Sequence, residues 1–229
     1  QGTLLPLSVE LGMNPALAAL HGHFQAGRLA VCQGCSYPDP SFSHEDSQRV
    51  WNTGDPTGLS ADGWMGRFLA QAGPPPDSPC AVSVMSSLSM LMSGSGAFVP
   101  AFTDVDDFSF PYDYDHWSDK DNRLAAYQAM SAGLGGAGGD LQVMAETSGG
   151  ILDLMDTFST LPDFTHVGAY PDSSLGERMQ LVARLMAADL GMRYFHVAQG
   201  GFDDHSDQNQ DNGHAENLAK VSQAVSALY

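Results

Sequence analysis

The chain has 229 residues, 43% of them hydrophobic and 16% charged, and this length and composition suit one sizeable folded core. Acidic residues outnumber basic ones 27 to 9, and the formal charge of −18 repels the phosphates of nucleic acids and anionic lipid surfaces. No apolar run approaches the roughly 20 residues of a membrane-spanning helix, so we expect a soluble protein with no membrane span and no nucleic-acid partner.

The first predicted elements are a helix and a strand. Asn14 followed by Pro15 is typical of a helix start, and apolar residues then recur at helical spacing until Gly27. The short apolar run at 29–32 lies between glycine and proline signals, which predicts a buried strand.

Ser43 and His44 begin a second predicted helix, which ends near Gly54. A hydroxyl or imidazole at a helix start lies where backbone amides can hold an anion, so both residues are candidate catalytic groups. Either one would need an activating base or a metal beside it. The alternative is that Ser43 only caps the helix and His44 lies on the surface.

A short helix near Trp64 and a strand at 81–85 precede an irregular acidic insertion at 86–121. Aspartates are interleaved there with aromatic residues, but the spacing lacks the central glycine and terminal glutamate of an EF-hand loop. We expect a solvated surface insertion, with calcium binding as the alternative.

Two helical regions follow the insertion. Helical spacing covers 141–161, with an interruption expected near 149–150 where two glycines adjoin. Ser173 or Ser174 then caps a helix whose apolar residues form one stripe, which is typical of packing against a core.

The end of the chain predicts a strand at 194–198, a polar loop at 199–213 and an amphipathic helix at 214–229. His196, within the strand, is expected to be a core residue. The order of helix, strand, loop and helix predicts an α/β fold with a mostly parallel sheet flanked by helices on both faces.

The loop at 200–205 reads Gly-Gly-Phe-Asp-Asp-His and is the strongest candidate site, because ligands of open parallel sheets bind beyond the carboxyl ends of strands. Asp203, Asp204 and His205 place two carboxylates and an imidazole on one tight turn, and His214 is a further candidate ligand. Imidazole with carboxylate suits zinc, whereas calcium or magnesium, the alternatives, prefer oxygen ligands. The competing interpretation is that the acidic residues only cap the next helix.

Several short motifs follow one another along the chain in a characteristic order. They are Met13-Asn-Pro-Ala-Leu-Ala-Ala-Leu20, Ala26-Gly-Arg-Leu-Ala-Val31, Tyr37-Pro-Asp-Pro40, Ser43-His44, Trp51-Asn-Thr-Gly54, Gly63-Trp-Met-Gly66 and Gly200-Gly-Phe-Asp-Asp-His205. In this order, together with Gln208, His214 and the terminal helix, the chain resembles domain-of-unknown-function family 1501 over nearly its whole length.

The resemblance implies an alkaline-phosphatase-like α/β fold, because that family is similar to the alkaline phosphatase and sulfatase superfamily. Its members usually carry a twin-arginine export signal, which implies a periplasmic or secreted protein. They also have a glycine-rich strand end before the part seen here, and Ser-Glu-Phe-Gly and Asp-His-Gly regions after it. We therefore expect one α/β domain over residues 1–229 that lacks the first and last core segments.

The resemblance also bears on mechanism. Alkaline phosphatases place a nucleophilic serine seven residues before a Trp-Ser-Thr-Gly sequence, and the same position before Trp51 holds His44. This implies that His44 replaces the nucleophile, that Ser43 acts in a shifted register, or that the nucleophile is lost. Asp203 and His205 match the superfamily's metal-binding Asp and His, although their spacing is shorter.

We therefore expect an exported, metal-dependent hydrolase-like protein that acts on a phosphate or sulfate ester of a small molecule. The alternative is a non-catalytic extracellular protein that keeps the fold and binds a glycan or a protein partner. The predicted catalytic groups are Ser43 and His44, and the predicted ligands of the divalent metal are Asp203, Asp204, His205 and His214.

Overall fold

The computed structural model describes residues 3–72, 79–94, 98–105, 108–110, 114–206, 208 and 213–229. They fall into two compact units, each assembled from separate stretches of the chain. The helical unit comprises Gln1–Tyr37, Phe164–Ala187 and Val197–Tyr229, and the mixed unit comprises Pro38–Asp163 and Ala188–His196.

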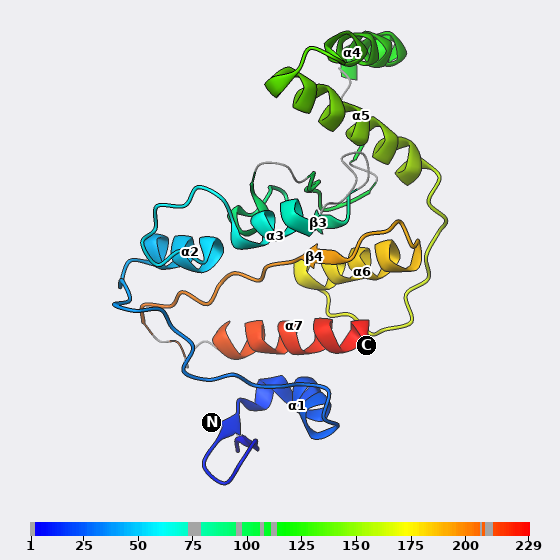
Figure 1. Ribbon diagram of the computed structural model, residues 1–229. Helices are drawn as coiled ribbons and strands as arrows, with labels where there is room; N and C mark the ends of the chain where they lie inside the picture. Colours follow the sequence, from blue (N-terminus) through cyan, green and yellow to red (C-terminus); the bar gives the residue numbers. More distant parts are fainter. Residues whose placement is uncertain are drawn as a thin grey trace. The chain divides into compact units, whose positions relative to one another are not determined.

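Helices dominate both units, and the predicted α/β fold with a mostly parallel, helix-flanked sheet is wrong (Figure 1). The described residues form two sheets of two strands each, one antiparallel and one parallel. The strand predicted at 29–32 is irregular, and Val31 is 42% exposed. A short apolar run becomes a strand only where neighbouring strands satisfy its backbone, and sequence periodicity does not reveal whether such partners exist.

The helical unit contains a short hairpin and the helices that enclose its core. The side chain of Asn14 accepts a hydrogen bond from the backbone N of Ala16, which confirms the predicted helix start. The elements of this unit are β1 (Leu5–Pro6), β2 (Gly12–Met13), the 3-10 helix η1 (Pro15–Leu17), α1 (Ala18–Gln25), α6 (Ser174–Ala187) and α7 (Gly213–Leu228).

The core of the helical unit lies between α6 and α7. Leu175 and Met179 of α6 are buried with Ala224 of α7, which confirms the apolar stripe predicted for α6. Helix α1 is joined to α7 by a hydrogen bond of 3.2 Å from the backbone N of Leu20 to Oγ of the buried Ser222. Both helices therefore pack on α7, and the first and last parts of the chain share one core (Figure 1).

In its described residues, the mixed unit combines the parallel strand pair with four α-helices. Its elements are α2 (His44–Thr53), α3 (Trp64–Ala72), β3 (Ala81–Ser83), η2 (Met90–Met92), η3 (Tyr114–Asp119), α4 (Lys120–Leu134), α5 (Gly139–Ser159) and β4 (Tyr194–His196).

Strands β3 and β4 run in parallel, with Ser83 opposite His196 at their carboxyl ends. Leu69 of α3 is completely buried in the core cluster that includes β3. The strands predicted at 81–85 and 194–198 are therefore confirmed in shorter form.

The Gly63-Trp-Met-Gly66 segment allows α3 to lie very close to the η2 region. A Cβ atom at Gly63 or at Gly66 would lie 2.1 Å from a backbone carbonyl oxygen of residues 90–93, closer than any real contact. Only glycine fits at both positions, so this motif has a packing reason.

The long helices α4 and α5 depart from the sequence prediction. Helix α5 continues through the predicted interruption at 149–150. Gly150 has a packing role there, since it is buried and a Cβ atom would lie 3.2 Å from the ring of Phe98. Sequence analysis does not predict α4, which has no buried residue to produce a clear apolar period. In the described part of the chain, no helix is both long and apolar enough to cross a bilayer.

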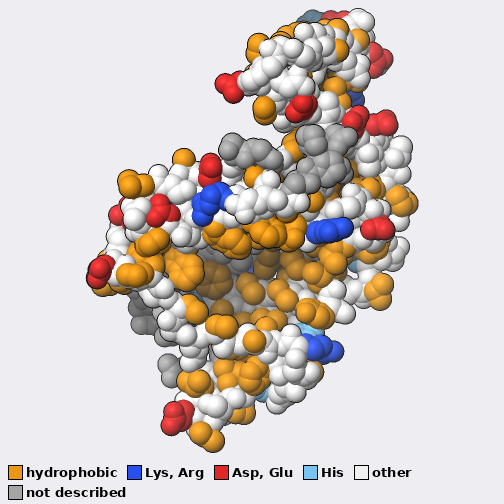
Figure 2. Space-filling view, in the orientation of Figure 1, with side chains coloured by type: hydrophobic (Ala, Val, Ile, Leu, Met, Phe, Trp, Pro, Cys, Tyr) orange, Lys and Arg blue, Asp and Glu red, His pale blue; other side chains and the backbone are white. Residues whose placement is uncertain are grey.

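The predicted acidic insertion at 86–121 lies partly outside the described residues, which exclude Asp106, Asp107 and Asp113. Its described part contributes η2, η3 and the start of α4. Acidic side chains are scattered over the face shown in Figure 2 and do not gather there into a single patch.

Candidate functional site

The loop after β4 is fixed to helix α7 by its backbone. Asn217 of α7 donates a hydrogen bond of 2.6 Å from Nδ2 to the carbonyl oxygen of Gly201, and Gln199 Nε2 lies 3.4 Å from Asn217 Oδ1. Gly201 has a φ of 82°, and a Cβ atom there would lie 2.9 Å from Asn217 Nδ2. Glycine is therefore favoured at this position by the backbone conformation, and a Cβ atom would also displace the amide of Asn217.

Asp203 and His205 lie side by side on this loop. Oδ1 of Asp203 is 3.0 Å from Nε2 of His205, and their side chains are 60% and 80% exposed. A carboxylate oxygen and an imidazole nitrogen thus sit next to each other with access to solvent. This is the arrangement of two adjacent ligands of one metal ion, and also of a simple surface ion pair.

Asp204 has a different role in the loop geometry. Its Oδ1 accepts a hydrogen bond of 3.2 Å from the backbone N of Ser206, which closes a local turn. Asp204 stands between Asp203 and His205 in the sequence, and its own carboxylate is engaged with the backbone. The metal role of Asp204 stays a prediction.

His214 lies in the first turn of α7 and contacts Gln208 and Phe202 rather than Asp203 or His205. Its Nδ1 is 3.3 Å from Nε2 of Gln208, and its ring meets Phe202 edge-on at a centroid distance of 5.9 Å. Among the described residues of the helical unit, neither Asp204 nor His214 adds a third ligand atom to Asp203 and His205. The helical unit therefore contributes two neighbouring ligand atoms.

Ser43 and His44 belong to the mixed unit, at the start of α2. Oγ of Ser43 accepts a hydrogen bond of 3.3 Å from the backbone N of Asp46, which confirms the capping role weighed in the sequence analysis. The backbone N of Ser43 donates to Oγ of Ser41 at 3.1 Å, so the turn before the helix is also fixed. His44 is exposed at the first helical position.

The Trp51-Asn-Thr-Gly54 segment ends α2. Gly54 has a φ of 63°, as expected for a residue that terminates a helix in the left-handed conformation. The guanidinium of Arg67 donates a hydrogen bond of 2.7 Å to the carbonyl oxygen of Thr53, which satisfies one of the free carbonyls at the helix end. This motif therefore has a structural explanation independent of catalysis.

Asp55 organises the loop that follows. Its carboxylate accepts hydrogen bonds from the backbone and hydroxyl of Thr57, at 2.9 and 2.7 Å, and from the backbone N of Leu59 and Ser60, at 3.1 and 2.9 Å. The hydroxyl of Thr57 is the largest of the influences that lower the pKa of Asp55 from its ordinary value of 3.8 to about 2. Asp55 is therefore an ionised loop anchor.

The structure also contains a hydroxyl–imidazole pair that sequence analysis missed. Oγ of Ser83 lies 3.2 Å from Nδ1 of His196, at the carboxyl ends of β3 and β4. Burial lowers the pKa of His196, and Ser83 is completely buried. A fully buried hydroxyl cannot reach a substrate, so the pair acts as a polar link between the two strands. The signal available in the sequence was one polar residue, Ser83 or His196, in each of the two predicted strands.

Comparison of the chain with protein-family models, with curated proteins and with solved structures finds no match in any of the three.

Proposed function

We propose that this protein is an exported, metal-dependent hydrolase that acts on phosphate or sulfate esters, with Asp203 and His205 as ligands of the metal. The observation that carries the proposal is the separation of 3.0 Å between Asp203 Oδ1 and His205 Nε2. Both side chains are exposed, and Asn217 holds their loop to α7 by a hydrogen bond to Gly201. Export and ester chemistry rest on the resemblance of the sequence motifs to family 1501.

The spacing of the two atoms supports zinc as the metal. Zinc lies about 2.0–2.1 Å from imidazole nitrogen and carboxylate oxygen, so adjacent corners of a tetrahedral site are roughly 3.3 Å apart. The two side chains would need to separate by only a few tenths of an ångström to bind it. Calcium and magnesium are less suited, because imidazole nitrogen is a poor ligand for either.

The metal would polarise the ester oxygen and activate a nucleophile, and the residues of the chain would hold it in place. Asp203 supplies negative charge that offsets the charge of the cation, and His205 supplies a neutral donor on the same turn. Asn217 holds the loop to α7 through Gly201, two residues before Asp203.

Ser43 and His44 are the proposed catalytic groups, as nucleophile or oxyanion contact. The start of α2 supports this role because the free backbone amides of a helix N-terminus favour an anion. Ser43 Oγ accepts a capping hydrogen bond but still has its own proton to donate.

A non-catalytic binding protein of the extracellular space is the second candidate. The observation that favours it is the use of Ser43 as a helix cap, which gives this serine a structural role without any nucleophilic one. Under this reading the 200–205 loop binds a glycan or a protein partner, and the metal site is absent or only structural.

Metal analysis combined with an ester screen separates the two candidates. Purified protein is titrated with Zn²⁺, and hydrolysis of 4-nitrophenyl phosphate and 4-nitrophenyl sulfate is followed in its presence. We expect one bound zinc and ester hydrolysis that both disappear in Asp203→Asn and His205→Gln. Asp172→Asn, at an exposed position in the same unit, is the matched control and should retain both. Equal zinc binding by all variants would contradict the metal site, and zinc binding without hydrolysis would favour the binding protein.

A further inference from the structure

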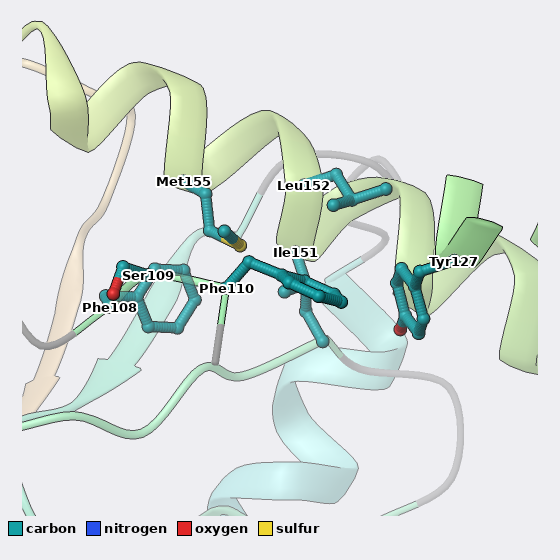
Figure 3. Close-up of a pocket in the computed structure, with 7 residues that line it drawn as sticks. All are labelled: Phe108, Ser109, Phe110, Tyr127, Ile151, Leu152 and Met155. Carbon is teal, nitrogen blue, oxygen red and sulfur yellow. The ribbon is translucent and has the colours of Figure 1, made fainter. Parts of the chain in front are cut away.

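A cavity in the mixed unit, separate from every residue considered so far, lies under helix α5 (Figure 3). Its volume is about 420 Å³, which is within the range of roughly 300–1,000 Å³ that small-molecule sites occupy. Ile151, Leu152 and Met155 of α5 form one wall, because Met155 lies four positions after Ile151 and three after Leu152, and such residues share one side of a helix. All three side chains are partly exposed rather than packed to completion.

The opposite wall is aromatic. Phe108 lines the cavity and also packs against two buried rings, with centroid distances of 5.1 Å to Phe102 and 5.3 Å to Phe158. Such edge-to-face clusters hold each ring in a defined orientation. This wall is therefore built on the core of the unit.

Two further aromatic rings line the cavity, those of Phe110 and Tyr127. Phe110 and Tyr127 lie 5.5 Å apart with their planes tilted by 55°, and Figure 3 shows Phe110 beneath α5 beside Ile151. The hydroxyl of Tyr127, on α4, donates a hydrogen bond of 3.0 Å to Oγ of Ser148, on α5. This bond holds the ring of Tyr127 against α5. Both rings are partly exposed.

The lining selects for an uncharged ligand. None of the seven side chains that line the cavity carries a charge, so a charged ligand would lose its hydration without gaining an ion pair. The hydroxyl of Ser109 is the polar group available at the margin, since the hydroxyl of Tyr127 is already paired. An apolar cavity holds water poorly, and an apolar ring would restore the dispersion contacts that its walls lack.

We propose that the cavity between Phe108, Phe110, Tyr127 and helix α5 is a binding site for an uncharged aromatic ring compound that carries at most one or two hydroxyl groups. The ring packs against Phe110 beneath α5, its edge meets Ile151 and Met155, and its hydroxyl group lies on the side of Ser109. This site does not depend on the metal loop, so either proposal can fail without the other.

The first test compares two probes that share a ring system but differ in charge. Intrinsic and probe fluorescence are recorded while the full chain is titrated with 2-naphthol or with 2-naphthoate. We expect saturable binding of 2-naphthol and affinity at least about tenfold lower for 2-naphthoate. Equal affinity for both probes, or no saturable binding of 2-naphthol, would overturn the proposal.

A substitution that fills the cavity locates the binding. Ile151→Trp should lower the affinity for 2-naphthol at least about tenfold, because the indole occupies the space of the probe. Val143→Trp is the matched control, since Val143 is 58% exposed on the same helix and does not line the cavity, and it should leave the affinity unchanged. Circular dichroism verifies that both variants fold. An unchanged affinity in folded Ile151→Trp would refute the site.

Methionine methyl NMR tests the site without changing its walls. In protein with ¹³C-methyl methionine, addition of 2-naphthol should shift the resonance of Met155, assigned by its loss in Met155→Leu. Met144, which is 57% exposed on the same helix, should not shift. A shift of Met144 without a shift of Met155 would place the probe elsewhere and contradict the proposal.

Discussion

Nδ2 of Asn217 donates a hydrogen bond of 2.6 Å to the carbonyl oxygen of Gly201, and this contact joins the loop that carries Asp203 and His205 to helix α7. The two proposed ligands therefore owe their position to a residue that belongs to neither the loop nor the ligand set. Residues that orient metal ligands commonly affect metal affinity when they are removed.

Asn217→Ala should weaken zinc binding by about tenfold, because the loop loses its attachment to α7 while both ligands remain. The free energy of unfolding should fall by about 1 kcal/mol, the usual loss for one hydrogen bond. Zinc titration and urea unfolding measure the two effects. Gln223→Ala, at an exposed amide of the same helix, is the control and should change neither.

Two adjacent glycines allow a second comparison on the same loop. Gly201→Ala should lower the free energy of unfolding by about 1–2 kcal/mol, because alanine at a φ of 82° is strained and its Cβ atom would approach Asn217 Nδ2 to 2.9 Å. Gly200→Ala should have little effect, because a Cβ atom there meets nothing within 4 Å. Urea unfolding of both variants provides the measurement, and equal losses would contradict the role given to Gly201.

The proposed ligand set predicts different outcomes for two neighbouring aspartates. Asp203→Asn should reduce zinc affinity by about 100-fold, because it removes a charged ligand. Asp204→Asn should reduce it much less, because the amide oxygen can still accept the hydrogen bond from Ser206. Isothermal titration with Zn²⁺ distinguishes them. If both substitutions cost the same affinity, Asp204 is a ligand and the set proposed here is incomplete.

The carboxylate of Asp55 should titrate with a midpoint near 2, below its ordinary value of 3.8. Since this pKa is lowered, the native state binds fewer protons than the unfolded state between these values. Asp55 therefore stabilises the fold fully above about pH 3.8, and this stabilisation is lost as the pH falls toward 2. Thr57→Val should raise the pKa of Asp55, and Thr57→Ser, which keeps the hydroxyl, should not. Carboxyl ¹³C NMR follows both.

His196, a basic group, should also make the stability of the fold depend on pH. Burial lowers its pKa below the ordinary 6.5, so the unfolded state takes up the proton first as the pH falls. The free energy of unfolding should therefore decrease as the pH drops below 6.5, and the decrease should end near the lowered pKa. His196→Gln keeps a polar partner for Ser83 without a titrating ring. The variant should lose this part of the pH dependence in urea unfolding measured from pH 7.5 to about pH 5.

Sequence analysis succeeded where the structure is decided by near neighbours in the chain. Asn14 and Ser43 both cap helices as predicted, because a side-chain acceptor needs only a backbone amide two or three residues away. The pairing of Asp203 with His205 was equally accessible, since one residue separates them.

Features that depend on distant parts of the chain were not predictable. Ser83 meets His196 across 113 positions, and no local pattern indicates which strand lies beside which. The predicted sheet was wrong for the same reason, because the run at 29–32 was assigned strand neighbours that it does not have. The capping of α2 by Arg67 also links separate helices and leaves no periodic trace in the sequence.

The hydrogen bond from Leu20 to Ser222 has a consequence for the order of folding, because it joins residues 202 positions apart. Helix α1 is synthesised well before its partner α7, which follows it by almost 190 residues. The helical unit must therefore wait for translation to reach α7, whereas most of the mixed unit, Pro38–Asp163, is contiguous and free to collapse beforehand. Until then the side of α1 that packs on α7 remains without its partner.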